Sequence, residues 1–336
     1  MEKILVTGAS GFIGFELTKS LLGRDYELFL FSRNINRLLN FKNKNVRKFE
    51  INFIDPSSLY NHDIKRIDTV IHLAASISYF GNKKRLYNAN VVSAINLYKW
   101  ARERGGKRFI FASSIEAMGV RGEPSPATEN DLCKPASSYG ESKLQAENAL
   151  IEQNKDNAME LVILRIGNVF GPRGPFFVVS LAEALLTKNK YYRYFPCYSE
   201  QKFQLIYIDD VVDGIFKTIE GKTVEGTYIL AGSEPMTVAD ILRLVSTKLD
   251  KNFEYKGENQ RKLSYLLFRK KVLEILHRGD FLSFMVAGSE IGNRRIFSVE
   301  KAKKELGFSP RVSIKTGIEK TLEWAKKEGV LKGFLG

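Results

Sequence analysis

The sequence predicts an α/β fold, a doubly wound parallel sheet with a smaller, interleaved C-terminal α/β domain. Short β-branched runs alternate with longer amphipathic stretches over the first two-thirds of the chain. The runs are apolar enough to be covered on both faces, and the first of them ends in a glycine-rich turn, which together predict the Rossmann arrangement. The expected strands are Lys3–Thr7, Glu27–Ser32, Val46–Asn52, Thr69–Leu73, Arg108–Ser113, Leu161–Arg165 and Gln204–Ile208.

The stretches between and after these strands define the helices and the domains. The expected helices are Phe12–Leu22, Arg85–Arg104, Ser138–Asn154 and two within Ser298–Gly329, separated at Gly307–Pro310. After about Gly171 the pattern becomes irregular, and no low-complexity linker separates the two halves. We therefore expect a dinucleotide-binding domain of residues 1–170 plus 203–230 and a substrate domain of residues 171–202 plus 231–336.

The composition is that of a globular protein in a reducing compartment. The chain has 336 residues, 44% of them hydrophobic and 27% charged. Its two cysteines, Cys133 and Cys197, are far apart, which argues against a disulfide scaffold or a thiolate zinc site, and we expect no bound metal. The first strand begins within a few residues of Met1, so we expect no signal peptide and a cytoplasmic location.

The charge is strongly basic. Lys and Arg exceed Asp and Glu by 14, with a pI near 9.5. Such a balance attracts anions such as nucleic acids, acidic membrane surfaces or phosphorylated small molecules, although a solvated lysine-rich surface explains it equally well. No zinc-finger spacing or RNA-binding signature is present, so we expect no nucleic-acid partner.

The glycine-rich turn predicts a phosphate-binding site. Gly8, Gly11 and Gly14 follow an apolar strand and open a helix, which is the context of a dinucleotide fingerprint. Glycines at these places allow a tight turn, close approach to a pyrophosphate and packing of the helix on the strand. The expected cofactor-binding residues of the turn are Gly8, Ser10, Gly11, Phe12, Ile13 and Gly14.

The end of the second strand indicates which cofactor binds. An acidic residue there would bind the ribose hydroxyls of NAD, but the sequence has Ser32 and Arg33, with Arg37 nearby. These residues offer partners for a 2′-phosphate and favour NADP over NAD. Further cofactor contacts are expected where the third and fourth strands end, at Asn52, Phe53, Leu73, Ala74 and Ala75. His72 is expected to be a packed structural residue.

A Tyr-x-x-x-Lys element predicts the catalytic group. Tyr139 and Lys143 share one face of a helix, where an ammonium lowers the pKa of a phenol and readies it to exchange the proton that accompanies hydride transfer. The same spacing occurs at Tyr79/Lys83 and Tyr198/Lys202. Only Tyr139 has partner serines, Ser113 and Ser114, at the end of an apolar strand, so we assign the chemistry to Tyr139 and Lys143 together with a serine of this pair.

These motifs resemble the extended short-chain dehydrogenase/reductases, and in particular their NAD-dependent epimerase/dehydratase group. The resemblance covers nearly the whole chain through the segments Thr7–Gly14, His72–Ala75 with Asn90, Ser113–Ser114, Pro135–Lys143 with Glu147, Arg165–Arg173, Ile206–Val211 and Ser298–Pro310. It implies that Ser114, Tyr139 and Lys143 are the catalytic triad, that Lys143 also holds the nicotinamide ribose, and that Asp210 is structural. It further implies that Asn90, Asn168 and Val169 contact the cofactor.

The resemblance leaves two reactions open. In a nucleotide-sugar epimerase, dehydratase or decarboxylase, Glu116 would take the place of a working glutamate, although Ile115 and Met118 depart from the dehydratase and epimerase patterns. In a reductase or dehydrogenase of less polar substrates, similar to dihydroflavonol reductases and 3β-hydroxysteroid dehydrogenases, the segment Ser114–Gly119 fits at least as well. The candidate substrate residues are Glu116, Tyr79, Arg173 and Arg294.

Three further expectations concern partners. The basic amphipathic segment 261–278 could lie on an anionic membrane, but a lid or core helix is the favoured interpretation. The helices expected at Arg85–Arg104 and Ser138–Asn154 could form a homodimer through a four-helix interface, as is common in the superfamily. A non-catalytic NAD(P)-binding regulator is disfavoured because Ser114, Tyr139 and Lys143 are all present.

Overall fold

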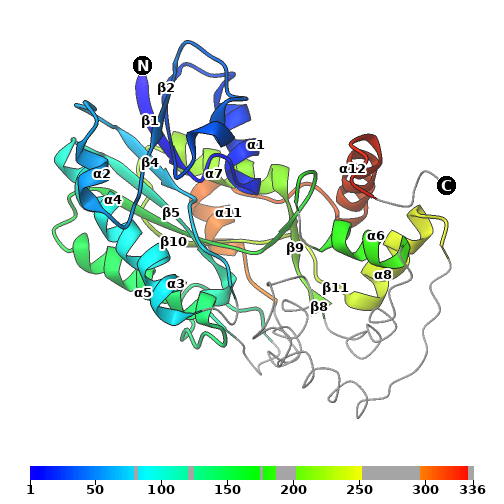
Figure 1. Cartoon of the computed structure of the whole chain (residues 1–336). Coiled ribbons are helices and arrows are strands. Elements are labelled where there is room, and N and C mark those ends of the chain that lie inside the picture. Colours follow the sequence, from blue (N-terminus) through cyan, green and yellow to red (C-terminus); the bar gives the residue numbers. More distant parts are fainter. Residues whose placement is uncertain (79–81, 120–124, 175–176, 187–201, 252–295, 332–336) are drawn as a thin grey trace.

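The central element is a parallel sheet in the order β10-β6-β5-β4-β1-β2-β3 (Figure 1). This arrangement comes from a computed structural model that describes residues 1–78, 82–119, 125–174, 177–186, 202–251 and 296–331. The strands of this sheet are β1 (Glu2–Thr7), β2 (Tyr26–Ser32), β3 (Val46–Glu50), β4 (Thr69–His72), β5 (Arg108–Ser114), β6 (Glu160–Ile166) and β10 (Gly226–Leu230). The predicted doubly wound α/β fold is confirmed.

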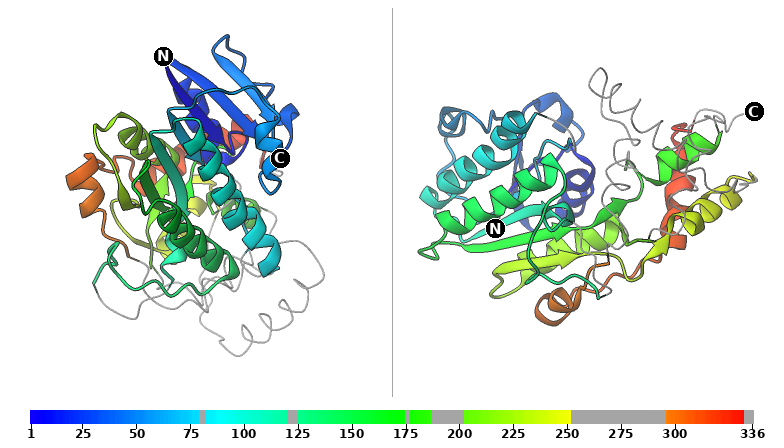
Figure 2. Two further views of the ribbon diagram at one scale, coloured as in Figure 1. Left: turned by 90° about the vertical axis from the view of Figure 1, so that its left-hand side faces the viewer. Right: turned by 90° about the horizontal axis from the view of Figure 1, so that it is seen from below.

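Helices cover both faces of the sheet, as the apolar strands require (Figure 2). On one face α1 (Phe12–Leu21) packs beside α7 (Ile208–Glu220), and on the other α2 (Pro56–Tyr60) and α5 (Ser138–Gln153) pack against α4 (Ser93–Glu103). Each face has its own hydrophobic core, and successive residues of β1, such as Ile4 and Leu5, enter opposite cores. All parallel strands end at one edge of this sheet, where the candidate site lies.

Two strand predictions needed correction. The expected strand Gln204–Ile208 is β9 (Leu205–Tyr207), but it pairs with β7 (Asn168–Phe170) in a small sheet of its own and does not enter the main sheet. The main sheet instead ends in β10, which was not predicted. Only three residues of β10, from Tyr228 to Leu230, are buried, so its apolar signal is too short to detect.

The helix expected at Arg85–Arg104 is interrupted. It consists of α3 (Lys83–Tyr87), a π-helical turn (Asn88–Val92) and α4. The additional residue of a π turn rotates the helix faces on either side of it relative to one another, and such turns are frequent at functional sites. Here the turn contains Asn90, whose side chain is fully buried. Hydrophobic periodicity does not predict such an interruption.

A second group of helices lies beside the sheet, where α12 (Ile314–Lys327) packs on α6 (Val178–Leu186) and α8 (Val238–Lys248) (Figure 1). The strands β8 (Lys202–Phe203) and β11 (Met236–Thr237) pair next to this group. In contrast, α11 (Glu300–Leu306) packs on β10 and α7 of the main sheet. The two expected C-terminal helices are therefore present, on different parts of the molecule.

Asp210 connects these parts. Its carboxylate accepts hydrogen bonds from the backbone N–H groups of Arg311 and Val312 at 2.9 and 3.1 Å. Asp210 lies in the first turn of α7, and the bonded residues precede α12. This contact agrees with the structural role that the family resemblance implies for Asp210.

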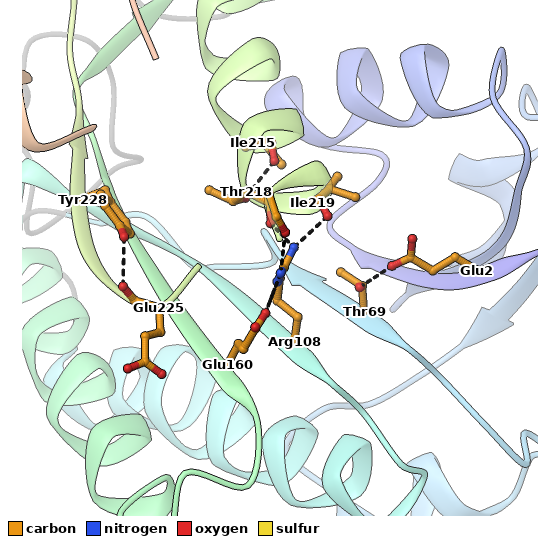
Figure 3. Close-up of polar contacts among 10 residues, drawn as sticks. Glu2, Thr69, Arg108, Glu160, Ile215, Thr218, Ile219, Glu225 and Tyr228 are labelled. Carbon is orange, nitrogen blue, oxygen red and sulfur yellow. Dashed lines mark hydrogen bonds and ion pairs between the residues drawn. The ribbon is translucent and has the colours of Figure 1, made fainter. Parts of the chain in front are cut away.

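Arg108 stabilises the edge of the sheet opposite the site (Figure 3). It starts β5, is buried, and pairs with Glu160 at the start of β6. Its guanidinium also donates to the backbone carbonyls of Thr218, Ile219 and Gly221, where α7 ends. The last carbonyls of a helix lack intrahelical donors and carry partial negative charge, so a buried arginine is a suitable cap.

Candidate active site

The glycine turn forms a cradle that excludes side chains. Gly8 has φ +71°, and a Cβ there would lie 2.8 Å from the backbone nitrogen of Ala74. A Cβ on Gly14 would lie 2.1 Å from the carbonyl oxygen of Gly8. The N-cap residue of α1, Gly11, provides no side-chain hydrogen bond, which leaves N–H groups of the first turn for an anionic ligand. This geometry fits the pyrophosphate of a dinucleotide.

The cradle is followed by an exposed, mixed-charge turn after β2. Arg33 and Arg37 are exposed, whereas the Ser32 hydroxyl is engaged with the backbone of Asn34. The sequence did not reveal that Glu50 lies beside this turn. Glu50 ends β3 in register with Ser32, and its carboxylate accepts a hydrogen bond from the Ile35 N–H at 3.3 Å. An acidic group is therefore present here after all, supplied by the neighbouring strand.

The end of β4 forms the wall opposite the cradle. Thr7 of β1 accepts a hydrogen bond from Ala74 N–H at 3.1 Å and lies 2.7 Å from Nδ1 of His72. His72 is buried among aromatic rings, including Phe111, and burial lowers its pKa to about 3, so it is neutral. These contacts agree with the structural function expected for His72. The backbone of Leu73 and Ala74 lies against Gly8.

Asn52 and Phe53, which we expect to contact the cofactor, lie in the loop after β3. The Asn52 side chain is exposed and accepts a hydrogen bond from Ile54 N–H at 3.3 Å. Phe53 is buried, with its ring 6.2 Å from that of His72. The Phe53 side chain is therefore part of the core, and the amide of Asn52 is the exposed polar group of the pair.

Ser114, Tyr139 and Lys143 come together where β5 ends and α5 begins. The Tyr139 phenol is hydrogen-bonded to Ser114. Ser137 caps the first turn of α5 by accepting a hydrogen bond from Gly140 N–H at 3.0 Å, which fixes the backbone on either side of Tyr139. Lys143 is one turn further along and is buried, with Nζ 4.2 Å from the centre of the Phe111 ring. The two competing tyrosines, Tyr79 and Tyr198, lie outside the described residues.

The pKa of Tyr139 departs from our expectation. Burial is the main cause of a raised pKa, and the nearby Glu116 carboxylate raises it further, while the hydrogen bond to Ser114 lowers it. The expectation that Lys143 lowers the pKa of Tyr139 is therefore wrong for the protein without a cofactor or substrate. Burial lowers the pKa of Lys143 itself to about 7, against the opposing effect of Glu147. Tyr139 consequently holds its proton in this structure.

Glu116 is part of this cluster. It lies in a 3-10 turn directly after β5, Ile115–Ala117, and is 3% exposed. The turn packs so closely on α5 that a Cβ on Gly140 would lie 2.2 Å from the Glu116 carbonyl oxygen. The candidate substrate residue Glu116 is thus held beside Tyr139.

Of the other candidate substrate residues, the structure describes Arg173. Arg173 stacks on Phe15 of α1, with its guanidinium carbon 3.7 Å from the ring centre, and has φ +67°. Arg173 therefore lies against the first turn of α1, close to the glycine cradle, and its contact with a substrate stays a prediction. Tyr79 and Arg294, like segment 261–278, lie outside the described residues.

Asn90 and Asn168 occupy different kinds of position. The Asn90 amide bonds both backbone groups of Ser76, at 2.7 and 3.0 Å, and donates to the Ser142 hydroxyl at 2.9 Å. It thus fixes the loop after β4 against α5, and a direct contact of Asn90 with a cofactor stays a prediction. Asn168 and Val169 lie in β7 at the active edge, partly exposed and open to a ligand.

The fold, the cradle and the Ser114–Tyr139–Lys143 cluster define a dinucleotide-dependent α/β enzyme. The sequence profile of the NAD dependent epimerase/dehydratase family matches residues 4–231. The chain belongs to this family, which confirms the resemblance, and it is an NAD(P)-dependent enzyme.

Known relatives act on different substrates. A UDP-glucose 4-epimerase from Vibrio cholerae is 31% identical over 260 residues, which cover 74% of this chain and 76% of the relative. A decarboxylating sterol-4-alpha-carboxylate 3-dehydrogenase from Mus musculus is 27% identical over 338 residues, 96% of this chain and 90% of the relative. The crystal structure of a UDP-glucose 4-epimerase from Thermotoga maritima with UDP-glucose has a TM-score of 0.75 at 24% identity, covering 97% of this chain and 99% of that one.

In the part of the chain that the structure describes, no helix is both long and apolar enough to cross a bilayer.

Proposed function

We propose that this protein transfers a hydride at a carbinol or carbonyl carbon of a nucleotide-sugar, with Tyr139 as the acid/base. The observation that carries the proposal is the cluster in which the buried Tyr139 phenol bonds Ser114 one turn before Lys143. Bound NAD(P) supplies the hydride acceptor and donor. The Vibrio cholerae relative and the net charge of +14 both support a sugar linked to a nucleoside diphosphate.

Each residue of the cluster has a distinct task in this proposal. Ser114 donates a hydrogen bond to the reacting oxygen, and Tyr139 gives its proton to that oxygen on reduction or removes it on oxidation. Burial and the nearby Glu116 raise the pKa of Tyr139, so its phenol carries the proton that reduction requires. Lys143 binds the nicotinamide ribose and, when charged, favours the phenolate needed for oxidation.

A second candidate is an NADPH-dependent reductase or dehydrogenase of a less polar substrate. The similarity to the sterol dehydrogenase from Mus musculus favours it, since that similarity extends over 96% of this chain. In this case the same three residues act on a carbonyl carried by a hydrophobic ring system. The two candidates differ in substrate, while the proton transfer is the same.

The test between the candidates starts from the purified protein. We expect conversion of UDP-glucose, UDP-galactose or UDP-glucuronic acid, followed by NMR of the sugar protons, without addition of a reductant. A reaction that returns the hydride to the sugar regenerates its own cofactor. We therefore expect the nucleotide extracted from the denatured protein to be NAD⁺ or NADP⁺ that the enzyme had retained. If the protein reduces a 3-ketosteroid with added NADPH and converts none of the three UDP-sugars, the second candidate is correct and the first is wrong.

The cofactor preference can be tested at the turn after β2. We propose that Arg33 and Arg37 bind a 2′-phosphate, giving a preference for NADP, and that the nearby Glu50 weakens it by like-charge repulsion. In fluorescence titrations, Arg33→Ala should weaken the binding of NADPH about tenfold and the binding of NADH less than about twofold. Glu50→Gln should strengthen the binding of NADPH and leave the binding of NADH unchanged. If the unaltered protein binds NADH more tightly and Arg33→Ala has no effect, Glu50 is the residue that selects the cofactor, through the ribose hydroxyls.

We propose that α4 and α5, which contact one another, form the homodimer interface expected from the sequence.

A further inference from the structure

A buried polar cluster lies directly behind the candidate catalytic residues. Glu147 follows Lys143 by one turn of α5, is 1% exposed, and forms an ion pair with Arg165 of β6. Its carboxylate accepts hydrogen bonds from Arg165 Nη2 at 2.8 Å and Nε at 3.2 Å. It also accepts a hydrogen bond from the Ser113 hydroxyl. One carboxylate therefore connects α5 to the ends of two strands.

The two strand residues are neighbours in the sheet. Ser113 and Arg165 pair in register on β5 and β6, and Ser113 directly precedes Ser114. Positions 139, 143 and 147 of α5 lie four residues apart and so share one face of the helix. The bond between Ser113 and Glu147 therefore controls how far α5 lies from the end of β5. Because Tyr139 lies on α5 and Ser114 on β5, the same helix–strand distance also affects the separation of their hydroxyl groups.

The buried ion pair between Glu147 and Arg165 is not an efficient way to stabilise the fold. Burying an ion pair costs desolvation energy that an apolar pair of the same size would not incur. The pair is satisfied from all sides, since Arg165 Nη1 also donates to the Glu129 carbonyl oxygen at 3.2 Å. Full satisfaction makes such a cluster rigid. Rigidity at this place serves the alignment of the neighbouring site.

We propose that Glu147, held by Ser113 and Arg165, is a positioning residue that aligns Tyr139 and Lys143 on α5 with Ser114 on β5 and that supports the charge of Lys143. The proposal rests on the proposed function of these three residues. The charged and titratable groups around Lys143 and Tyr139 are His72 of β4, Glu116 of the turn after β5, Glu147 of α5 and Arg165 of β6. Of these, Glu147 raises the pKa of Lys143.

The test compares Glu147→Gln with a matched control at the other end of the same strands. Arg108 and Glu160 form a partly buried pair where β5 and β6 begin, in register with one another. Glu160→Gln therefore removes a carboxylate from an equivalent pair remote from the site. For Glu147→Gln we expect kcat to fall at least tenfold with KM changed less than threefold, and for Glu160→Gln neither should change. Glu147→Asp should recover part of kcat.

A second measurement needs no substrate. The ¹⁵Nζ resonance of Lys143, identified by its absence from the Lys143→Met spectrum, should titrate near pH 7 in the unaltered protein and at lower pH in Glu147→Gln. Glu160→Gln should leave this titration unchanged. The proposal is overturned if Glu147→Gln lowers thermal stability but leaves both kcat and the Lys143 titration as they were. Failure of the proposed function would instead show as an unaltered protein without turnover, with the titration still dependent on Glu147.

Discussion

Replacing Tyr139 with Phe should lower kcat about a thousandfold and leave cofactor affinity within a factor of about three. The phenol is a proton-transferring group bonded to Ser114, and general acid–base catalysis contributes two to four orders of magnitude. The ring itself is retained, so its packing in the buried cluster should survive. The measurement is the initial rate on the substrate found for the unaltered enzyme, with cofactor affinity from fluorescence titration.

Tyr98 provides the matched control. It is buried in the core between the sheet and α5, and its hydroxyl donates to Asn154 Oδ1 at 2.6 Å. Tyr98→Phe removes the same atom from the same kind of environment at a cost of about 1 kcal/mol in unfolding free energy. Activity should remain within twofold. A Tyr139→Phe enzyme as active as the Tyr98→Phe enzyme would show that another group moves the proton.

The second large effect is expected at Gly14. A Cβ there would lie 2.1 Å from the Gly8 carbonyl oxygen, and neither backbone segment can move without opening the cradle. Gly14→Ala should lower the free energy of unfolding by about 2 kcal/mol, as overpacking does. Calorimetric titration with NAD(H) and NADP(H) should show affinity at least about tenfold weaker, because the N–H groups of α1 move away from the pyrophosphate.

Gly23, just beyond the end of α1, is the control for this change. A Cβ on Gly23 would meet nothing closer than the Ser20 carbonyl oxygen at 3.9 Å. Gly23→Ala should leave cofactor affinity unchanged and stabilise the protein slightly by restricting the unfolded chain. If Gly14→Ala bound either cofactor as tightly as Gly23→Ala, the turn would not be the pyrophosphate site.

The fold could be read from the sequence because its signals are local. Six of the predicted strands fall within two residues of strands of the main sheet. Five of them are runs of mostly buried residues, whereas β3 (Val46–Glu50) has no buried residue. The two failures have different causes. The strand Leu205–Tyr207 joined a different sheet because strand pairing is decided by distant parts of the chain, and β10 was missed because only three of its residues are buried. Residue pattern alone carries no such information for short strands.

For the site, the sequence by itself predicted the glycine turn and the choice of Tyr139 with Lys143, and the family resemblance added Ser114. Both depend on residue type at a fixed spacing, and a strand end is enough to place Ser114 on the active edge. Only the tertiary structure placed Glu50 beside the turn after β2, Arg173 on α1, and Glu147 between Ser113 and Arg165. Strand register and helix packing create these contacts. Only the tertiary structure, too, showed that Tyr139 retains its proton, because burial and a carboxylate held nearby set its pKa.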